Sequence, residues 1–195
     1  MRIVGGQFKS RLISMPKGVD IRPTQDKVRQ AIFNVLADVN GKRVLELFAG
    51  TGAFGIEALS RGASYVTFVD NNLKCTETIR ANLDSLGIQG SSYDIIKTNA
   101  LSVLPRLSKG AEKYDLVFMD PPYHAGLAKK CLINIDDYDI LAPVAVVIVE
   151  SFKKDVLATG LKTLVLEKEK KYGDTIITIF RRIADEESQD SGISG

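Results

Sequence analysis

The chain has 195 residues, of which 45% are hydrophobic and 26% are charged, as expected for one soluble globular domain. No apolar run reaches the roughly 18 residues that a membrane-spanning helix needs, and residues 1–6 lack the apolar core of a signal peptide. A membrane protein is therefore excluded, and a cytoplasmic location is expected. Cys75 and Cys131 lie far apart and His124 is the single histidine, so we expect reduced structural thiols and no metal site.

The net charge of +2 conceals a concentration of positive charge at the N-terminus. Residues 1–43 hold nine Lys or Arg against three Asp, a net charge of +6. Alternating segments at residues 2–4 and 11–13 predict a small basic β-hairpin or arm over residues 1–24, within the same domain as the rest. Phe8 among these cations favours a nucleic-acid surface, with a merely solvated face as the alternative. We assign as RNA contacts Arg2, Lys9, Arg11 and Arg22.

The main domain is predicted over residues 25–183. Thr24 is a candidate N-cap of a helix whose apolar stripe comprises Val28, Ile32, Val35 and Leu36 and which ends before Gly41. Strand patterns with helical segments between them then follow at residues 44–47, 65–69, 94–96, 116–119 and 144–149. This alternation predicts an α/β, Rossmann-like fold with five parallel strands.

The end of the chain departs from a dinucleotide-binding fold. Two further strands, at residues 161–166 and 175–180, have no room for a crossover helix between them and should form an antiparallel hairpin. The expected sheet therefore has seven strands. Residues 184–195 carry four acidic side chains and no apolar face, and we expect a disordered acidic tail there.

A glycine-rich loop follows the first strand of the main domain. Residues 50–55 satisfy the pattern GxGxxG, and Asp70 ends the next strand, where a ribose-binding carboxylate is expected. A structural glycine turn is the alternative. Glu46 at the end of the first strand would repel a pyrophosphate but would hold an amino group, which favours S-adenosylmethionine over a dinucleotide.

Further residues complete the predicted cofactor site. Asp70 would accept hydrogen bonds from both ribose hydroxyls. Asn99, with Ala100 beside it, lies where adenine would rest, although Asn99 would equally serve as a helix N-cap. We assign to cofactor binding Glu46, Phe48, Gly50, Thr51, Gly52, Asp70, Asn71, Asn99 and Ala100.

The run Asp120-Pro121-Pro122-Tyr123 caps the fourth strand. Two prolines remove two backbone donors, so this turn offers a carboxylate, bare carbonyls and an aromatic ring. The amino group of a nucleobase could donate to Asp120 and to the Pro121 carbonyl while its ring stacks on Tyr123. We therefore assign Asp120, Pro121 and Tyr123 to catalysis. An ordinary proline-rich turn is the alternative.

These residues resemble class I S-adenosylmethionine-dependent methyltransferases that act on amino groups, whose fourth motif is Asp or Asn, Pro, Pro, then Tyr or Phe. Nearly the whole chain, to about Arg182, is further similar to the bacterial 16S ribosomal RNA guanine-N2 methyltransferase family. The segments that support this likeness are residues 1–6, 22–24, 26–29, 47–52, 57–63 and 172–174.

The resemblance implies a seven-stranded class I methyltransferase fold and methylation of the exocyclic N2 of one guanine in 16S ribosomal RNA, the family's target being guanine 966. S-adenosylmethionine is the implied donor and S-adenosylhomocysteine the product. A small-subunit assembly particle is the expected partner of a monomeric enzyme. The family more usually has Asp where this chain has Glu46 and Asn99; Glu46 keeps the charge and Asn99 keeps an acceptor.

Three other functions remain compatible with parts of this pattern. An NAD-dependent oxidoreductase would use the glycine loop and Asp70 but gives no role to the Asp120 motif. An adenine-N6 methyltransferase shares the site but normally has a larger target-recognition region. A non-enzymatic RNA-binding module with a vestigial pocket would use only the basic arm. In an enzyme, Asp120 would either accept the departing proton or only orient the amine.

Overall fold

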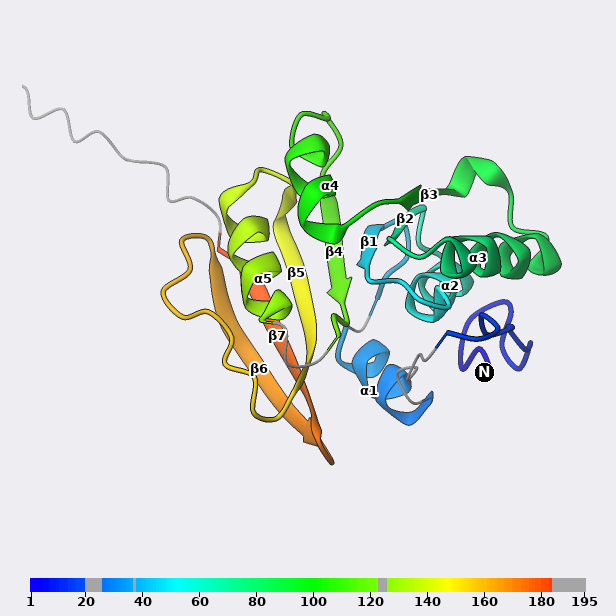
Figure 1. Ribbon diagram of the computed structural model, residues 1–195, viewed down its shortest axis with the longest axis horizontal. Coiled ribbons are helices and arrows are strands. Elements are labelled where there is room, and N and C mark those ends of the chain that lie inside the picture. The colour runs from blue at the N-terminus through cyan, green and yellow to red at the C-terminus, as the bar shows by residue number, and fades with distance from the viewer. Residues whose placement is uncertain (20–25, 37, 123–125, 184–195) are drawn as a thin grey trace, which may run out of the picture.

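The computed structural model describes residues 1–19, 26–36, 38–122 and 126–183 (Figure 1). Thr24, Arg22, Tyr123, His124 and the predicted acidic tail lie outside these residues. The helices are α1 (Asp26–Leu36), α2 (Ala53–Ser60), α3 (Leu73–Leu86), α4 (Ala100–Leu107) and α5 (Leu127–Asp137). The strands are β1 (Arg43–Leu47), β2 (Tyr65–Asp70), β3 (Tyr93–Lys97), β4 (Tyr114–Met119), β5 (Leu141–Phe152), β6 (Leu164–Tyr172) and β7 (Thr175–Arg182).

One sheet of seven strands runs through the molecule in the order β3-β2-β1-β4-β5-β7-β6. Strands β1 to β5 pair in parallel, whereas β7 pairs antiparallel with both β5 and β6. The predicted set of five parallel strands followed by a C-terminal antiparallel hairpin is thus confirmed. The first strand of the hairpin was predicted at residues 161–166, but β6 begins later, at Leu164, and extends to Tyr172 as a largely exposed edge strand.

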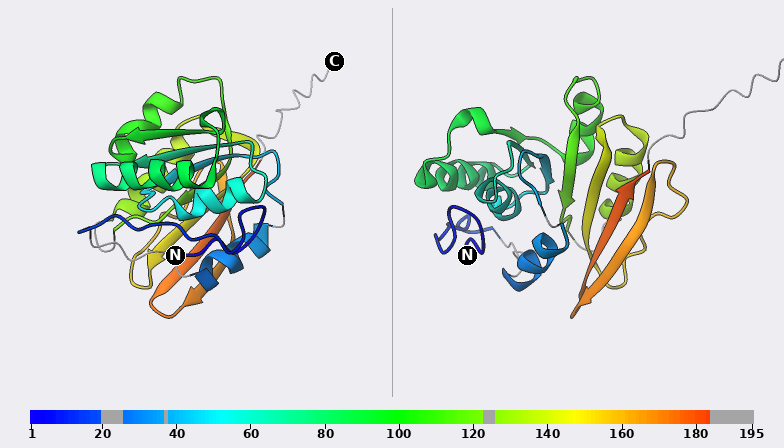
Figure 2. Two further views of the ribbon diagram at one scale, coloured as in Figure 1. Left: turned by 90° about the vertical axis from the view of Figure 1, so that its right-hand side faces the viewer. Right: turned by 180° about the vertical axis from the view of Figure 1, so that it is seen from behind.

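Helices cover both faces of the sheet (Figure 2). Apolar side chains of β1, β4 and β5 alternate between the faces, so that Leu45, Val117 and Val147 pack with α4 and α5. Their neighbours Val44 and Phe118 pack with helices α1, α2 and α3 on the opposite face. This doubly covered arrangement explains why the parallel strands read as continuous apolar runs.

Two of the four residues in the predicted apolar stripe of helix α1 are buried. Val28 and Ile32 are buried, whereas Val35 and Leu36 are only partly so. Phe33 stacks on Phe54 of α2 with ring centroids 4.8 Å apart, and Phe54 stacks on Phe118 of β4 at 4.0 Å. Three aromatic rings therefore join α1, α2 and the centre of the sheet.

The N-terminal segment folds over helix α2. Residues Arg2 and Leu12 form an antiparallel bridge, and backbone hydrogen bonds from Ile3 N to Arg11 O and from Ile13 N to Met1 O further join the two segments of the predicted hairpin. The Ser60 hydroxyl at the end of α2 donates to the Gly5 carbonyl at 2.6 Å and accepts from the Phe8 amide at 2.9 Å. All eight residues of α2 are buried, so the helix is enclosed between the sheet and this segment.

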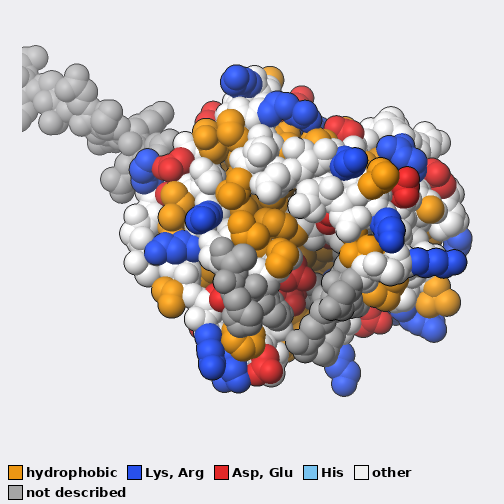
Figure 3. Space-filling view, viewed as in Figure 1, with side chains coloured by type: hydrophobic (Ala, Val, Ile, Leu, Met, Phe, Trp, Pro, Cys, Tyr) orange, Lys and Arg blue, Asp and Glu red, His pale blue; other side chains and the backbone are white. Residues whose placement is uncertain are grey.

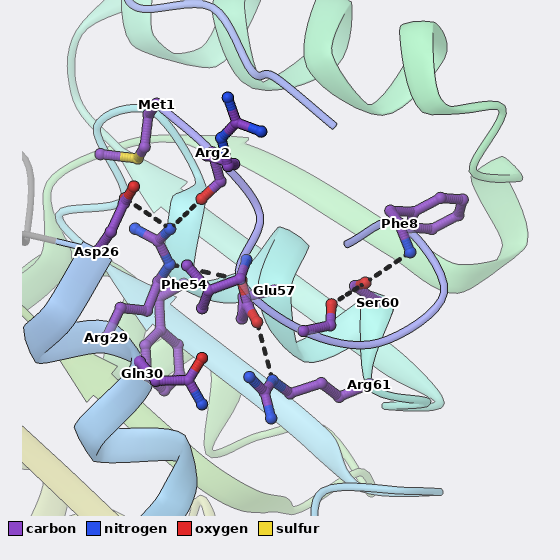
Figure 4. Close-up of polar contacts among 12 residues, drawn as sticks. Met1, Arg2, Phe8, Asp26, Arg29, Gln30, Phe54, Glu57, Ser60 and Arg61 are labelled. Carbon is purple, nitrogen blue, oxygen red and sulfur yellow. Dashed lines mark hydrogen bonds and ion pairs between the residues drawn. The ribbon is translucent and has the colours of Figure 1, made fainter. Parts of the chain in front are cut away.

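A carboxylate in α2 ties the enclosing segments together (Figure 4). Glu57 is fully buried; it accepts from the Val4 amide at 2.8 Å and from Arg61 Nε at 2.9 Å. Arg29 of α1, only 1% exposed, places its Nε 3.6 Å from the same carboxylate. The Arg29 guanidinium also donates to the carbonyl of Arg2 and to Asp26. Glu57 therefore links α1, α2 and the N-terminal segment.

Within the described residues, no helix combines the length and apolar character needed to cross a membrane. Cys75 and Cys131 are both buried and free.

Glu57→Ala should lower the free energy of unfolding by about 3 to 5 kcal/mol, because Arg29 then stays buried without its carboxylate partner on α2. Urea denaturation followed by circular dichroism measures this loss. Glu77→Ala, at an exposed position of α3, is the matched control and should change stability by less than about 0.5 kcal/mol. Equal losses in the two variants would contradict the role given to Glu57.

Candidate active site

The candidate site lies where the parallel strands end. Leu47 of β1 pairs with Val69 of β2 and with Met119 of β4, and Met119 pairs with Val149 of β5. The residues that follow these four positions therefore lie at one level of the sheet. They are Phe48, Asp70, Asp120 and Glu150. In an open α/β sheet, ligands bind at this carboxyl edge.

Asp70 holds the glycine loop against β2. One carboxylate oxygen accepts from the Gly50 amide at 2.8 Å, and the other accepts from the Asn72 amide at 2.8 Å. Each oxygen keeps a further lone pair for a hydroxyl donor, because an ionised carboxylate accepts at about four positions. Asp70 is partly exposed, so these lone pairs are within reach of a ligand.

Two glycines of the loop pack too closely against the protein core to be replaced by residues with side chains. Gly52 has φ of 72°, in the left-handed region. A Cβ on Gly55 would lie 2.4 Å from the ring of Phe68 and 2.7 Å from the carboxylate of Glu46. Phe48 also adopts a left-handed φ, of 57°, which is uncommon for a residue with a side chain. Close packing and left-handed backbone conformations therefore fix the shape of this loop.

Glu46 caps the start of α2 from inside the core. Its side chain, in a residue 3% exposed, accepts from the Gly55 amide at 2.8 Å and from the Phe54 amide at 3.3 Å. Burial raises the pKa of Glu46 to about 8, although the two amides and Arg29 act in the opposite direction. The negative charge is thus disfavoured in the free protein, and a nearby cation would restore it.

The other predicted cofactor residues differ in their surroundings. Asn99 is the N-cap of α4, since its side-chain oxygen accepts from the Leu101 amide at 2.8 Å. Ala100, the first residue of α4, is buried, and Asn71, directly after β2, is exposed. Thr51 is buried, and its hydroxyl lies 3.9 Å from the sulfur of Met1. The Thr51 hydroxyl therefore faces the N-terminal segment.

The proline motif begins immediately after β4. Asp120 is partly exposed, Pro121 is buried and Pro122 is exposed. Tyr123, assigned to the same motif, lies outside the described residues. Across β1, Asp70 and the glycine loop border the same edge, so the predicted cofactor site and the predicted amine site lie on neighbouring strands.

The predicted RNA contacts do not gather at one place. Arg2 and Lys9 are exposed, and the exposed Arg11 donates to the Ser85 carbonyl at 2.9 Å. Arg11 therefore lies at the C-terminal end of α3. Lys9 follows Phe8, whose amide donates to Ser60 at the C-terminal end of α2. Both helix ends are away from the carboxyl edge of the sheet, and Arg22 is outside the described residues. Figure 3 shows acidic side chains near the centre of one face and Lys and Arg side chains around them.

Sequence reasoning missed Glu150. It ends the apolar run of residues 145–149 in β5 and is 5% exposed. An acidic residue at the carboxyl end of a buried strand was the signal that identified Glu46 and Asp70 as candidates, and the same signal was available for Glu150.

The sequence matches the family described as "Conserved hypothetical protein 95" over residues 1–181. It is 34% identical over 189 residues to ribosomal RNA small subunit methyltransferase D of Escherichia coli (strain K12), covering 96% of this chain and 93% of that protein. It is also 33% identical over 183 residues to putative rRNA methyltransferase YlbH of Bacillus subtilis (strain 168), covering 93% and 99%. The chain belongs to this methyltransferase family.

A solved structure agrees with this assignment. The putative methyltransferase yhhF from Escherichia coli superposes with a TM-score of 0.82 at 33% identity, covering 95% of this chain and 99% of that one. The class I methyltransferase fold expected from the sequence is thereby confirmed. Membership of a methyltransferase family favours this class over the oxidoreductase alternative.

Glu46→Gln should be more stable relative to the wild type at pH 8 than at pH 5. A carboxyl group whose pKa is about 8 in the folded protein and 4.5 in the unfolded chain stabilises the fold fully below pH 4.5, and this contribution is lost as the pH rises to about 8. Gln is neutral throughout, so the difference should change by on the order of a few kcal/mol.

Urea denaturation at the two pH values measures the effect. The matched control is Glu77→Gln at an exposed position of α3, whose stability difference from the wild type should stay constant. If the Glu46→Gln difference also stayed constant, Glu46 would titrate as an ordinary carboxyl.

Proposed function

We propose that this protein transfers the methyl group of S-adenosylmethionine to the exocyclic N2 of a guanine in 16S ribosomal RNA, at the family's target, guanine 966. The observation that supports this most strongly is the shared carboxyl edge, where the Asp120 motif adjoins the loop held by Asp70. Relatives that are 33–34% identical are named as ribosomal RNA methyltransferases. S-adenosylhomocysteine is the other product.

The residues at the edge fit this cofactor. The two Asp70 oxygens suit two ribose hydroxyls. Glu46 would favour the cationic amino group, with no phosphate to repel. The remainder of S-adenosylmethionine would be bordered by Phe48, Gly50, Thr51, Asn71, Asn99 and Ala100. When bound, S-adenosylmethionine supplies a methyl group activated by a sulfonium.

Asp120 and the Pro121 carbonyl would orient the acceptor amine. The N2 lone pair of guanine is delocalised into the ring, so hydrogen bonds from both amine hydrogens are needed to turn that lone pair toward the methyl carbon. The N–C bond forms as the C–S bond breaks, and the amine loses one proton to Asp120 or to water. Alignment can lower the activation free energy by about 7 to 11 kcal/mol, whereas acid–base assistance lowers it by roughly 3 to 5 kcal/mol.

The RNA must present its base unstacked. Stacking of the base on Tyr123 would replace the stacking lost in the RNA and would contribute about 1 to 3 kcal/mol to binding. Phosphate contacts would be made by Arg2, Lys9, Arg11 and Arg22. The first three are exposed on the N-terminal segment, away from the carboxyl edge of the sheet, which suits a large, prefolded RNA. A monomer acting on a small-subunit assembly particle meets these requirements.

Asp70 and Asp120 should have opposite effects when replaced. Asp70→Ala should raise the dissociation constant of S-adenosylmethionine at least about tenfold, since it removes the ribose acceptor. Asp120→Ala should leave that constant within a few fold and reduce methyl transfer by at least about 10². Calorimetry and a labelled methyl-transfer assay measure the two quantities. Loss of cofactor binding in Asp120→Ala would show that Asp120 was assigned to the wrong ligand.

Arg2→Ala and Lys9→Ala should each weaken RNA binding and flatten its salt dependence. Removal of one phosphate contact lowers the slope of log K against log salt by about 0.7 to 0.9. Lys109→Ala, an exposed lysine beyond α4, is the control and should leave the slope unchanged. An unaltered slope in Arg2→Ala or Lys9→Ala would remove that residue from the RNA surface.

Nucleoside mass spectrometry of ribosomal RNA tests the proposed reaction in cells. RNA from cells without the gene should lack one N2-methylguanosine of the small subunit, and expression of the wild-type chain should restore it. The Asp120→Ala chain should not restore it. A full complement of N2-methylguanosine in the deletion strain would refute the proposal.

A further inference from the structure

Glu150 is a buried acidic residue beside the proposed base site. The parallel register pairs Met119 of β4 with Val149 of β5, so Asp120 and Glu150 are neighbours one residue farther along. Phe118 and Ile148 pack on the face of helices α1, α2 and α3. Since side chains alternate along strands, Asp120 and Glu150 lie on that same face. Neighbouring strands are about 4.8 Å apart, so one base could span both positions.

Strand order separates the two ligands. Strand β4 lies between β1 and β5, so Glu150 is on the side of Asp120 away from the glycine loop. A cofactor held by the loop and Asp70 would approach Asp120 from β1, whereas a base would approach from β5. Glu150 therefore borders the base and not the cofactor.

A carboxylate at this place distinguishes nucleobases by their hydrogen-bonding edges. Guanine presents N1–H beside its exocyclic amine, and both groups donate. Adenine and cytosine carry an amine too, but the neighbouring ring nitrogen is an acceptor. An ionised carboxylate only accepts, so it pairs with guanine N1–H and repels the lone pair of the other two bases.

We propose that Glu150 accepts the N1–H of the target guanine while Asp120 and the Pro121 carbonyl accept its amine hydrogens. Glu150 is then the residue that selects guanine, a choice that the Asp120 motif alone leaves open. This role rests on the proposed function, since it concerns the acceptor base of the same reaction. A site that pairs with a donor strongly rejects an analogue without it.

The test uses small-subunit RNA carrying either guanine or 2-aminopurine at the methylated position. 2-Aminopurine keeps the amine but has an acceptor at N1. The wild type should prefer guanine by at least about 10² in kcat/KM. Glu150→Gln can donate its amide N–H to N1 of 2-aminopurine, so its preference should fall at least tenfold and activity on 2-aminopurine should rise.

Two further variants separate recognition from folding. Glu169→Gln, at an exposed position of β6, is the matched control and should keep the wild-type preference. Glu150→Asp retains a carboxylate, so it should keep the preference for guanine even where its rate is lower. A purely structural Glu150 would alter both RNAs by the same factor in Glu150→Gln, and that result would overturn the inference.

The outcomes also distinguish this inference from the proposed function. A wild-type protein that methylates guanine, combined with an unchanged preference in Glu150→Gln, would refute the role of Glu150 and leave the reaction standing. A wild-type protein that transfers no methyl group to guanine-containing RNA would refute the reaction itself.

Discussion

Helix α2 is buried over its whole length, and its polar groups must therefore find partners inside the protein. At its start the amides of Phe54 and Gly55 donate to Glu46 of β1. Farther along, Glu57 binds the N-terminal segment and Arg29 of α1. Because these partners come from both sides, α2 fixes the glycine loop before it and the segments that cover it. The shape of the proposed cofactor site follows from this enclosure.

The parallel register divides the edge of the sheet between two proposed ligands. Asp70 and the glycine loop occupy the β1 and β2 side, while Asp120 and Glu150 occupy the β4 and β5 side. An acidic residue lies at or near the carboxyl end of each of these four strands, but the surroundings differ. Glu46 is neutralised by burial, whereas Asp70 is partly exposed and accepts from two amides. Position along the strand order, and not residue type, therefore assigns each carboxylate its proposed role.

Local patterns predicted the sheet well where burial dictates the residues, as in the apolar runs that became β1, β4 and β5. Strand β6 was misplaced because its exposed Lys and Glu residues carry no apolar alternation. The sequence alone left two roles open for Asn99, an adenine contact and a helix N-cap, and the N-cap became visible only with helix α4 in place. Glu150 could be recognised as a candidate site residue only from its position beside Asp120, which lies thirty positions earlier in the chain. The register of β4 and β5 shows this proximity.

The most direct test of the proposed reaction uses purified protein, S-adenosylmethionine with a labelled methyl group, and small ribosomal subunits from cells that lack the gene. After digestion, the label should appear as N2-methylguanosine from a single position of 16S ribosomal RNA, and it should be absent with Asp120→Ala. Label in N6-methyladenosine, or no label in RNA at all, would contradict the assignment of this site to guanine N2.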